Sequence, residues 1–346
     1  MLSLDIRKIE NATIPVSTSW LLGACMEAKG KQDLWSKQKP ETLRVLREQA
    51  IIQSAESSNR IEGVTVEAAR LRPIVLGKSR PRDRSEEEIV GYRKALKWVF
   101  NRKRPIPIEA KTLLHLHALC RGGSSGDAGR WKKRDNEIIE VLPGGERRVR
   151  FIPTSAKKTP GTIDLLCDRY QEVGGEERFP SLLVIATFVF DFLCVHPFRD
   201  GNGRVSRLLT SLLLVRHGFE VCRYISLEQM VEETKEDYYG ILGRCSDGWH
   251  EGTNEMLPWW NYFLSALRQA YCEFAERVEQ AGHHGKGHLV RQVIRAQIGS
   301  FSLGELQAQC PCVSAQLIKK VLSEMKQAGS LRLVGRGRGA RWENAG

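Results

Sequence analysis

His196-Pro-Phe-Arg-Asp-Gly-Asn-Gly-Arg-Val-Ser-Arg207 is the stretch that decides how this chain folds around a functional site. It brings an imidazole, a carboxylate, a glycine-rich turn and two guanidinium groups into one segment. Apolar residues recur at helical spacing directly after the glycines, at Val205, Leu208, Leu209, Leu212 and Leu213. Backbone N–H groups are free at the start of a helix, and the helix dipole is positive there. The turn is therefore predicted to bind an anion.

The charged residues of this segment suit a polyphosphate. Arg204 and Arg207 are three residues apart, so they occupy neighbouring positions on the predicted helix. Guanidinium groups donate hydrogen bonds to phosphate in pairs and keep their charge. Asp200 precedes the turn, where a carboxylate and phosphate oxygens together suit Mg²⁺. A neutral imidazole at His196, on the far side of Pro197, would accept the proton of an attacking hydroxyl.

The segment resembles the signature of the Fic (filamentation induced by cAMP) family, His-x-Phe-x-Asp/Glu-Gly-Asn-Gly-Arg-x-x-Arg, at every fixed position. The resemblance implies a mainly α fold, with a Fic-type helical core and a β-hairpin flap. It also implies an adenylyltransferase that uses Mg²⁺ and moves AMP from ATP to a Ser, Thr or Tyr hydroxyl of a target protein or of the chain itself.

The family's roles carry over onto this segment by position. His196 would be the catalytic base, and Asp200 would hold Mg²⁺ between the α- and β-phosphates. Within the nucleotide-binding stretch, Phe198 would be a core anchor and not a ligand. The remaining positions would contact the phosphates: Gly201, Asn202 and Gly203 at the α/β end, Arg204 at the β/γ end, and Arg207 at the γ-phosphate.

A second motif lies near the N-terminus. Residues 54–63 read Ser-Ala-Glu-Ser-Ser-Asn-Arg-Ile-Glu-Gly, a helical stretch that ends at Gly63 with Ser58 and Glu62 one turn apart. Such a pair is common on solvated helix faces. It is also similar to the inhibitory motif Ser/Thr-x-x-x-Glu-Gly/Asn of Fic proteins. That resemblance implies that Glu62 pairs with Arg207 in place of the γ-phosphate, so that ATP binds out of line for attack.

Residues 137–153 are predicted to form two short strands around a glycine turn. One interpretation is an ordinary surface hairpin. The Fic resemblance implies instead a flap on which the target's hydroxyl-bearing segment docks as an added strand.

Residues 283–346 are strongly basic, with ten Lys or Arg against three acidic residues, in a chain of net charge +12. Helical patterns are followed by two short strands around a Gly/Arg-rich turn, which resembles a winged helix-turn-helix domain. If this domain binds DNA, the expected phosphate contacts are Lys319, Lys320, Arg336 and Arg338. The alternative is a winged helix used for protein contacts or for a homodimer.

The length of 346 residues suggests two or three domains. We predict an N-terminal helical region over 1–104 with the inhibitory motif, a Fic catalytic core with following helices over 105–280, and a winged helix-turn-helix domain over 283–346, joined by a linker at 281–287. Nine scattered cysteines favour reduced thiols, and no signal peptide opens the sequence. The longest apolar run, Leu182 to Phe190, is too short to span a bilayer, so we expect a soluble cytoplasmic protein without a membrane partner.

Two functions remain open on the sequence alone. The first is an autoinhibited protein adenylyltransferase. The second is a DNA-binding transcriptional regulator whose Fic core senses a nucleotide or removes AMP. The motif at 196–207 is predicted to bind phosphates and does not distinguish one nucleotide base from another, so a nucleotide donor other than ATP also stays possible.

Overall fold

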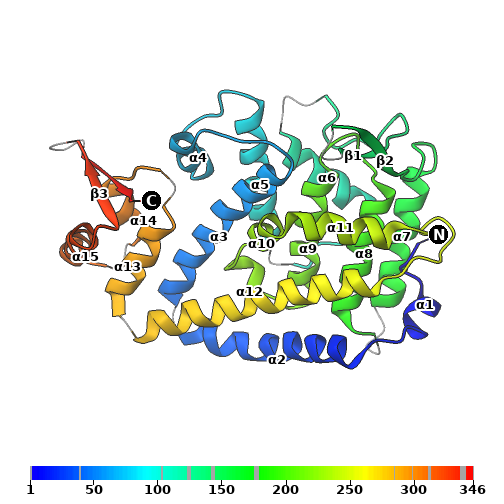
Figure 1. The fold of residues 1–346 in the computed structure, drawn as a ribbon, viewed down its shortest axis with the longest axis horizontal. Helices are drawn as coiled ribbons and strands as arrows, with labels where there is room; N and C mark the ends of the chain where they lie inside the picture. The colour runs from blue at the N-terminus through cyan, green and yellow to red at the C-terminus, as the bar shows by residue number, and fades with distance from the viewer. Residues whose placement is uncertain are drawn as a thin grey trace.

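The computed structural model describes residues 2–38, 40–102, 104–122, 126–141, 145–174, 179–283, 285–297, 299–310, 313–335 and 340–345. The chain is mainly helical, with two small antiparallel hairpins, as predicted (Figure 1). The N-terminal helices are α1 (Ile6–Glu10), α2 (Val16–Gln38), α3 (Pro40–Ile61), α4 (Ala68–Val75) and α5 (Arg84–Phe100). The central elements are α6 (Ala110–Arg121), β1 (Ile138–Val141), β2 (Arg147–Phe151), α7 (Thr159–Gly174), α8 (Ser181–Val195) and α9 (Asn202–Arg216). They continue with the 3₁₀ turn η1 (Val221–Arg223), α10 (Leu227–Glu233), α11 (Lys235–Ser246) and α12 (Leu257–His283).

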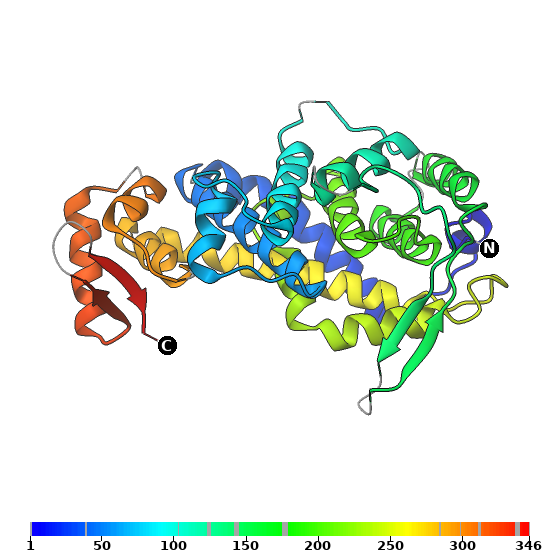
Figure 2. The same ribbon diagram turned by 90° about the horizontal axis from the view of Figure 1, so that it is seen from above.

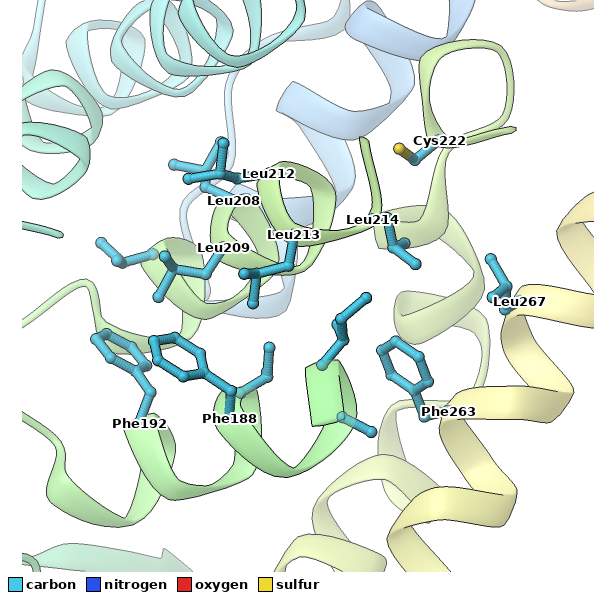
Figure 3. Close-up of a cluster of buried hydrophobic side chains, with 14 of the residues drawn as sticks. Phe188, Phe192, Leu208, Leu209, Leu212, Leu213, Leu214, Cys222, Phe263 and Leu267 are labelled. Carbon is cyan, nitrogen blue, oxygen red and sulfur yellow. The ribbon is translucent and has the colours of Figure 1, made fainter. Parts of the chain in front are cut away.

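The helices α8 and α9 form the centre of the main hydrophobic core. Both are buried around much of their circumference, and they pack against each other on either side of the turn that joins them. Figure 3 shows Phe188 and Phe192 of α8 facing Leu209 and Leu213 of α9, while Leu208 and Leu212 lie on the other side of α9. The predicted leucine stripe is therefore buried, and it fixes the N-terminal end of α9 beside the C-terminal end of α8.

The N-terminal residues belong to the same core, which extends from Leu2 to Val278. The long helix α12 lies alongside α2 and closes one side of the bundle (Figure 1). Asp191, fully buried within α8, accepts hydrogen bonds from the backbone N–H groups of Ser3 and Leu4 and from the indole N–H of Trp249. These three bonds satisfy a carboxylate that would otherwise be costly to bury.

The predicted flap is present as the β1–β2 hairpin, which extends from the helical body (Figure 2). Its strands pair antiparallel, with an irregularity between Ile138 and Ile139. Ile139 and Val149 are about half exposed, at 49% and 46%, so the hairpin offers apolar side chains to solvent. Residues 142–144, including the predicted turn at Pro143 and Gly144, lie outside the described residues.

A second unit follows α12. It comprises α13 (Gly285–Arg295), α14 (Leu303–Gln309), α15 (Ala315–Gln327) and the hairpin of β3 (Leu331–Val334) and β4 (Arg341–Asn344), around a separate small core. Three helices followed by a hairpin are the elements that the winged-helix prediction requires, and the assignment to that fold stays a prediction. Arg336 and Arg338, the predicted wing contacts, lie outside the described residues.

The linker prediction over 281–287 was wrong in extent. The helix α12 continues to His283 and α13 begins at Gly285, so residues on both sides of position 284 are helical. The glycines here fall at helix ends, where glycine is tolerated, and not in a long connection. In the part of the chain that is described, no helix is long and apolar enough to cross a membrane. The eight described cysteines form no disulfide.

Candidate active site

The turn between α8 and α9 is held by its own side chains. His196 caps α8 in the left-handed conformation, with φ of 50°, and it is the non-glycine residue with positive φ in the described chain. The amide of Asn202 accepts from the N–H of Phe198 at 2.9 Å and donates to the Phe198 carbonyl at 2.8 Å. Gly201 adopts φ of 84°, which suits glycine, and starts α9. Asn202 thus shapes the turn with its side chain, and any phosphate contact from it comes from the backbone.

Phe198 is fully buried. Its ring stacks on His117 with centroids 3.8 Å apart and on Trp131 at 5.1 Å. His117 accepts from the Gly129 N–H at Nδ1, so its proton lies on Nε2 and is donated to the Asp200 carbonyl at 3.0 Å. Burial lowers the His117 pKa to about 4, which keeps the ring neutral. The sequence analysis did not predict that His117 supports the turn through Phe198 and Asp200.

Two further residues that the sequence analysis missed hold the outer side of the turn. The buried Lys132 donates to the Val195 carbonyl at 3.2 Å and to Asn136 Oδ1 at 2.7 Å. Asn136 in turn donates to the Phe198 carbonyl at 3.1 Å. The backbone on both sides of His196 is therefore fixed by a segment that leads directly into the flap.

His196 lines a cavity of about 220 Å³. Its Nδ1 lies 3.3 Å from the Leu193 carbonyl, which can only accept, so Nδ1 carries the proton and Nε2 keeps its lone pair. Burial lowers the pKa of His196 to about 4 and leaves the imidazole neutral. The same cavity is lined by Glu62, Arg150 of the flap and Arg207. The geometry therefore provides a proton acceptor beside two guanidinium groups, one of which is paired with Glu62.

The N-terminus of α9 opens into this cavity through Gly203. Within the described chain, no group accepts a hydrogen bond from the N–H of Asn202, Gly203 or Arg204. The Glu62 carboxylate lies against this end, since a Cβ added to Gly203 would come within 2.2 Å of Glu62 Oε1. A carboxylate thus stands at the positive end of the helix, where an anion is favoured.

Arg207 joins α9 to the second predicted motif. Its guanidinium donates to Ser58 Oγ and to the Ser58 carbonyl, both at 2.9 Å, and to Glu62 Oε1 at 2.8 Å. Arg207 and Ser58 are buried, whereas the Glu62 side chain is 24% exposed. Gly63 follows with φ of 78°, the conformation that ends α3. The structure therefore brings Ser58, Glu62 and Arg207 together.

Arg204 lies in a different set of contacts, which the sequence analysis did not foresee. It is 1% exposed and donates to Glu88 Oε2 of α5 at 2.6 Å. Glu88 also accepts from Arg121 at 2.7 Å and from Arg84 at 3.0 Å. Arg121 continues to Asp200 Oδ2 at 2.7 Å, and Arg204 lies 3.4 Å from Asp200 Oδ1. Glu88 is thus the centre of an arginine cluster that orients both Arg204 and the half-exposed Asp200 carboxylate.

Known proteins resemble this chain in sequence and in fold. A model of the Fic/DOC family matches residues 107–214, which span α6 to α9. The protein adenylyltransferases Fic of Drosophila melanogaster and Drosophila erecta are 28% identical over 255 and 215 residues, covering 71% and 60% of this chain. The matched regions are 45% and 39% of those relatives, so this chain spans less than half of their length.

Solved structures share the fold. A Fic family protein from Desulfovibrio desulfuricans superimposes with a TM-score of 0.61 at 20% identity, over 97% of this chain and 98% of that one. Fic-1 from C. elegans superimposes with a TM-score of 0.60 at 19% identity, over 76% of this chain and 73% of that one. Residues 107–214 thus match the Fic/DOC family, and the complete motif at 196–207, the Drosophila relatives and the shared fold support a Fic family protein.

Proposed function

We propose that this chain is a protein adenylyltransferase that is inhibited by its own Glu62. The observation that carries the proposal is the shared cavity: the His196 lone pair, the N-terminus of α9 and the Arg207 guanidinium all face the same space. Phosphoryl-type transfers depend mainly on positioning and charge stabilisation, which these groups supply. The Drosophila relatives, which carry the name protein adenylyltransferase, support the same reaction.

In the proposed reaction, His196 Nε2 takes the proton of a target hydroxyl. The hydroxyl oxygen forms a bond to the α-phosphorus of ATP, the bond from that phosphorus to the β-phosphate bridge oxygen breaks, and pyrophosphate leaves. The N–H groups at the start of α9 and Arg207 stabilise the negative charge of the phosphates. Arg204, held by Glu88, lies behind the turn and supports Asp200 in its orientation.

The donor set at Asp200 fits a magnesium ion that is bound together with a nucleotide. Mg²⁺ commonly takes one carboxylate and several phosphate or water oxygens, and the Asp200 carboxylate is 46% exposed. No cluster of three or more His, Cys, Asp or Glu side chains that could hold a metal occurs among the described residues, at Asp200 or elsewhere, so phosphate and water oxygens would complete the ligands. When bound, the ion would neutralise phosphate charge, with Asp200 as its protein ligand.

The inhibitory part of the proposal rests on the place of Glu62. Its carboxylate bonds to Arg207 and lies at the start of α9, so it occupies an anion position that a terminal phosphate would otherwise take. Removal of this carboxylate is expected to allow ATP to bind with its α-phosphate in line. The target segment is proposed to dock on the flap 137–153, where Ile139 and Val149 are exposed and Arg150 faces the cavity.

The test uses ATP radiolabelled at the α-phosphate, with Mg²⁺, and follows label on the protein itself and in a lysate. We expect strong labelling by Glu62→Gly, weak labelling by the wild type, and a loss of about 10²–10⁴-fold when His196→Ala is added to Glu62→Gly. If Glu62→Gly binds ATP and transfers no label, the transferase proposal is wrong.

A second candidate function is DNA binding through residues 283–346. In α15, Ile318 and Val321 are buried while Lys319 and Lys320 are exposed, so this helix turns a basic face outward. A mobility shift with duplex DNA tests it: affinity that falls with salt and weakens on Lys319→Gln and Lys320→Gln supports this function. Salt-independent or absent binding would remove it.

A further inference from the structure

A second cavity, of about 940 Å³, lies beside the proposed magnesium ligand. Asp200 lines it together with every residue of 130–136, the segment that precedes the flap. It shares no described lining residue with the cavity of His196 and Arg207. Among its described lining residues, seven are Lys or Arg and three are Asp, which leaves a net charge of +4. Its volume is in the range of ligand sites, and the excess of cations favours an anionic ligand.

Four of these cations are available to a ligand. Of the other three, Arg84 and Arg121 bond to the carboxylate of Glu88, and the buried Lys132 bonds to the turn. The available cations are exposed, and none of their side chains forms an ion pair or a hydrogen bond with a described residue: Arg130, Lys133, Arg134 and Arg199. Like charges that are grouped in this way repel one another, so an anion among them is attracted by all four.

The backbone that carries two of these cations is fixed. Lys132 donates from its backbone N–H to the Pro197 carbonyl at 2.9 Å, in addition to the bonds that its side chain and Asn136 make to the turn. Lys133 and Arg134 lie between these two anchored residues. A ligand that binds them therefore does not have to order the backbone, which is one of the costs of binding.

The lining distinguishes an acidic peptide from a nucleic acid or a polyphosphate. The carboxylates of Asp127 and Asp135 stand among the cations. A phosphate chain has no donor for them and is repelled, whereas a peptide offers N–H groups to carboxylates and its own carboxylates to cations. Single-stranded nucleic acids also bind by stacking successive bases on aromatic rings. Trp131 is the one aromatic residue in the described lining, and its ring already stacks on Phe198 at 5.1 Å.

We infer that this cavity binds an acidic segment of the target protein. The segment 130–136 leads into β1, and within the described chain no strand other than β2 pairs with β1. Since β2 packs against α11, a target strand would add to the free edge of β1. Arg134 precedes Ile138 by four residues, which span at most about 14 Å. The acidic residues are therefore expected within about four or five positions of the docked strand.

The assignment of the acidic segment to a substrate rests on the proposed function, whereas the affinity of the cavity for acidic peptides does not. Binding is therefore tested first, without ATP, by fluorescence anisotropy of the full chain. The probes are a labelled peptide rich in Glu, the same peptide with Gln in place of Glu, and a single-stranded oligonucleotide of equal charge. The Glu peptide is expected to bind with an affinity that falls as salt is added, and the Gln peptide is not. If the Glu peptide does not bind, the inference is wrong.

Variants locate the site. The double variant Lys133→Gln with Arg134→Gln is expected to weaken binding of the Glu peptide by about fivefold or more. The matched control is Lys97→Gln with Lys111→Gln, which removes the same charge from exposed positions of α5 and α6 outside the cavity lining. Equal losses in both double variants would overturn the inference, because net charge alone would then attract the peptide. A loss confined to the oligonucleotide would assign the cavity to nucleic acid instead.

The substrate role has its own readout. In the Glu62→Gly background, transfer of label from ATP is measured on peptides that carry one Ser, Thr or Tyr between acidic or between neutral residues. The acidic peptides are expected to be labelled several-fold faster through a lower KM, and the Lys133→Gln and Arg134→Gln pair should remove this preference. Equal labelling of both sets would refute the substrate role. If Glu62→Gly labels neither peptides nor itself, the proposed transferase activity fails, and the anisotropy result still decides whether the cavity binds acidic peptides.

Discussion

Replacement of Gly203 by alanine is expected to separate Glu62 from Arg207. The added Cβ would lie 2.2 Å from Glu62 Oε1, whereas ordinary contact begins near 3.4 Å. The oxygen would therefore have to move by roughly 1.2 Å, and the 2.8 Å bond from Arg207 would exceed hydrogen-bonding distance. A hydrogen bond between charged groups contributes about 1.5–3 kcal/mol, and alanine in a helix gains about 0.5–1 kcal/mol over glycine. The net loss of stability is thus about 0.5–2.5 kcal/mol.

The same substitution should behave differently once Glu62 is absent. In a Glu62→Ala background, the closest remaining neighbour of the new Cβ is the flexible end of Arg207, at 3.2 Å. Gly203→Ala should then be neutral or stabilising by about 0.5–1 kcal/mol, which gives a coupling energy of about 1.5–3 kcal/mol between the two positions. Alanine at 62 is preferable to glycine here, because glycine would also change the entropy of the unfolded chain.

Urea denaturation of the wild type, both single variants and the double variant measures this coupling. Gly240→Ala in α11 is the control, since a Cβ there meets nothing within 4 Å and should leave stability unchanged or slightly higher in both backgrounds. Additive effects of Gly203→Ala and Glu62→Ala would refute the reasoning, because they would mean that Glu62 does not rest against the start of α9 in solution.

Three other outcomes follow from the site. Glu88→Gln should lower the free energy of unfolding by about 3–5 kcal/mol, because it leaves buried arginines without their carboxylate. Glu343→Gln removes one partner of an exposed ion pair and should change the free energy of unfolding by less than about 1 kcal/mol. Urea melts of both variants test this difference. The kcat/KM of Glu62→Gly should stay constant as the pH falls to about 4 to 5, since His196 is neutral above its lowered pKa. A fall in kcat/KM already near pH 6.5 would contradict the conclusion that burial lowers the pKa of His196. For His117, whose pKa is also about 4, the unfolded chain binds the proton first as the pH falls from 6.5. Stability should therefore decrease through that window by up to about 1.4 kcal/mol per pH unit, and urea melts of His117→Gln should show a shallower slope.

The sequence predicted those helices and strands that are indicated by residues close together in the chain. The apolar spacing after Gly203 indicated α9, and the glycine turn within 137–153 indicated the flap hairpin; both are present. The predicted pairing of Glu62 with Arg207 also corresponds to a direct contact. This pairing was predicted from the resemblance to the inhibitory motif, because periodicity alone does not indicate contacts between residues far apart in the sequence.

The arginine cluster around Glu88 could not be predicted in the same way. Glu88 follows Glu86 and Glu87, and a run of acids on a helix usually marks a solvated face. Its partners Arg121 and Arg204 are 33 and 116 residues away, so only the tertiary fold shows that Glu88 is buried among arginines. For the same reason, the prediction that Arg204 reaches a phosphate remains a prediction, since this side chain is enclosed by Glu88 and Asn59.

The buried carboxylate of Asp191 is expected to affect the order in which the chain folds during synthesis. Its partner Ser3 precedes it by 188 residues, and its partner Trp249 follows it by 58. Contacts of such separation close large loops and slow the search for the native topology. A nascent chain that ends before Trp249 lacks a donor for a charge at the centre of α8. The helix that positions His196 is therefore expected to become protected from hydrogen exchange only after the residues near 249 have been synthesised.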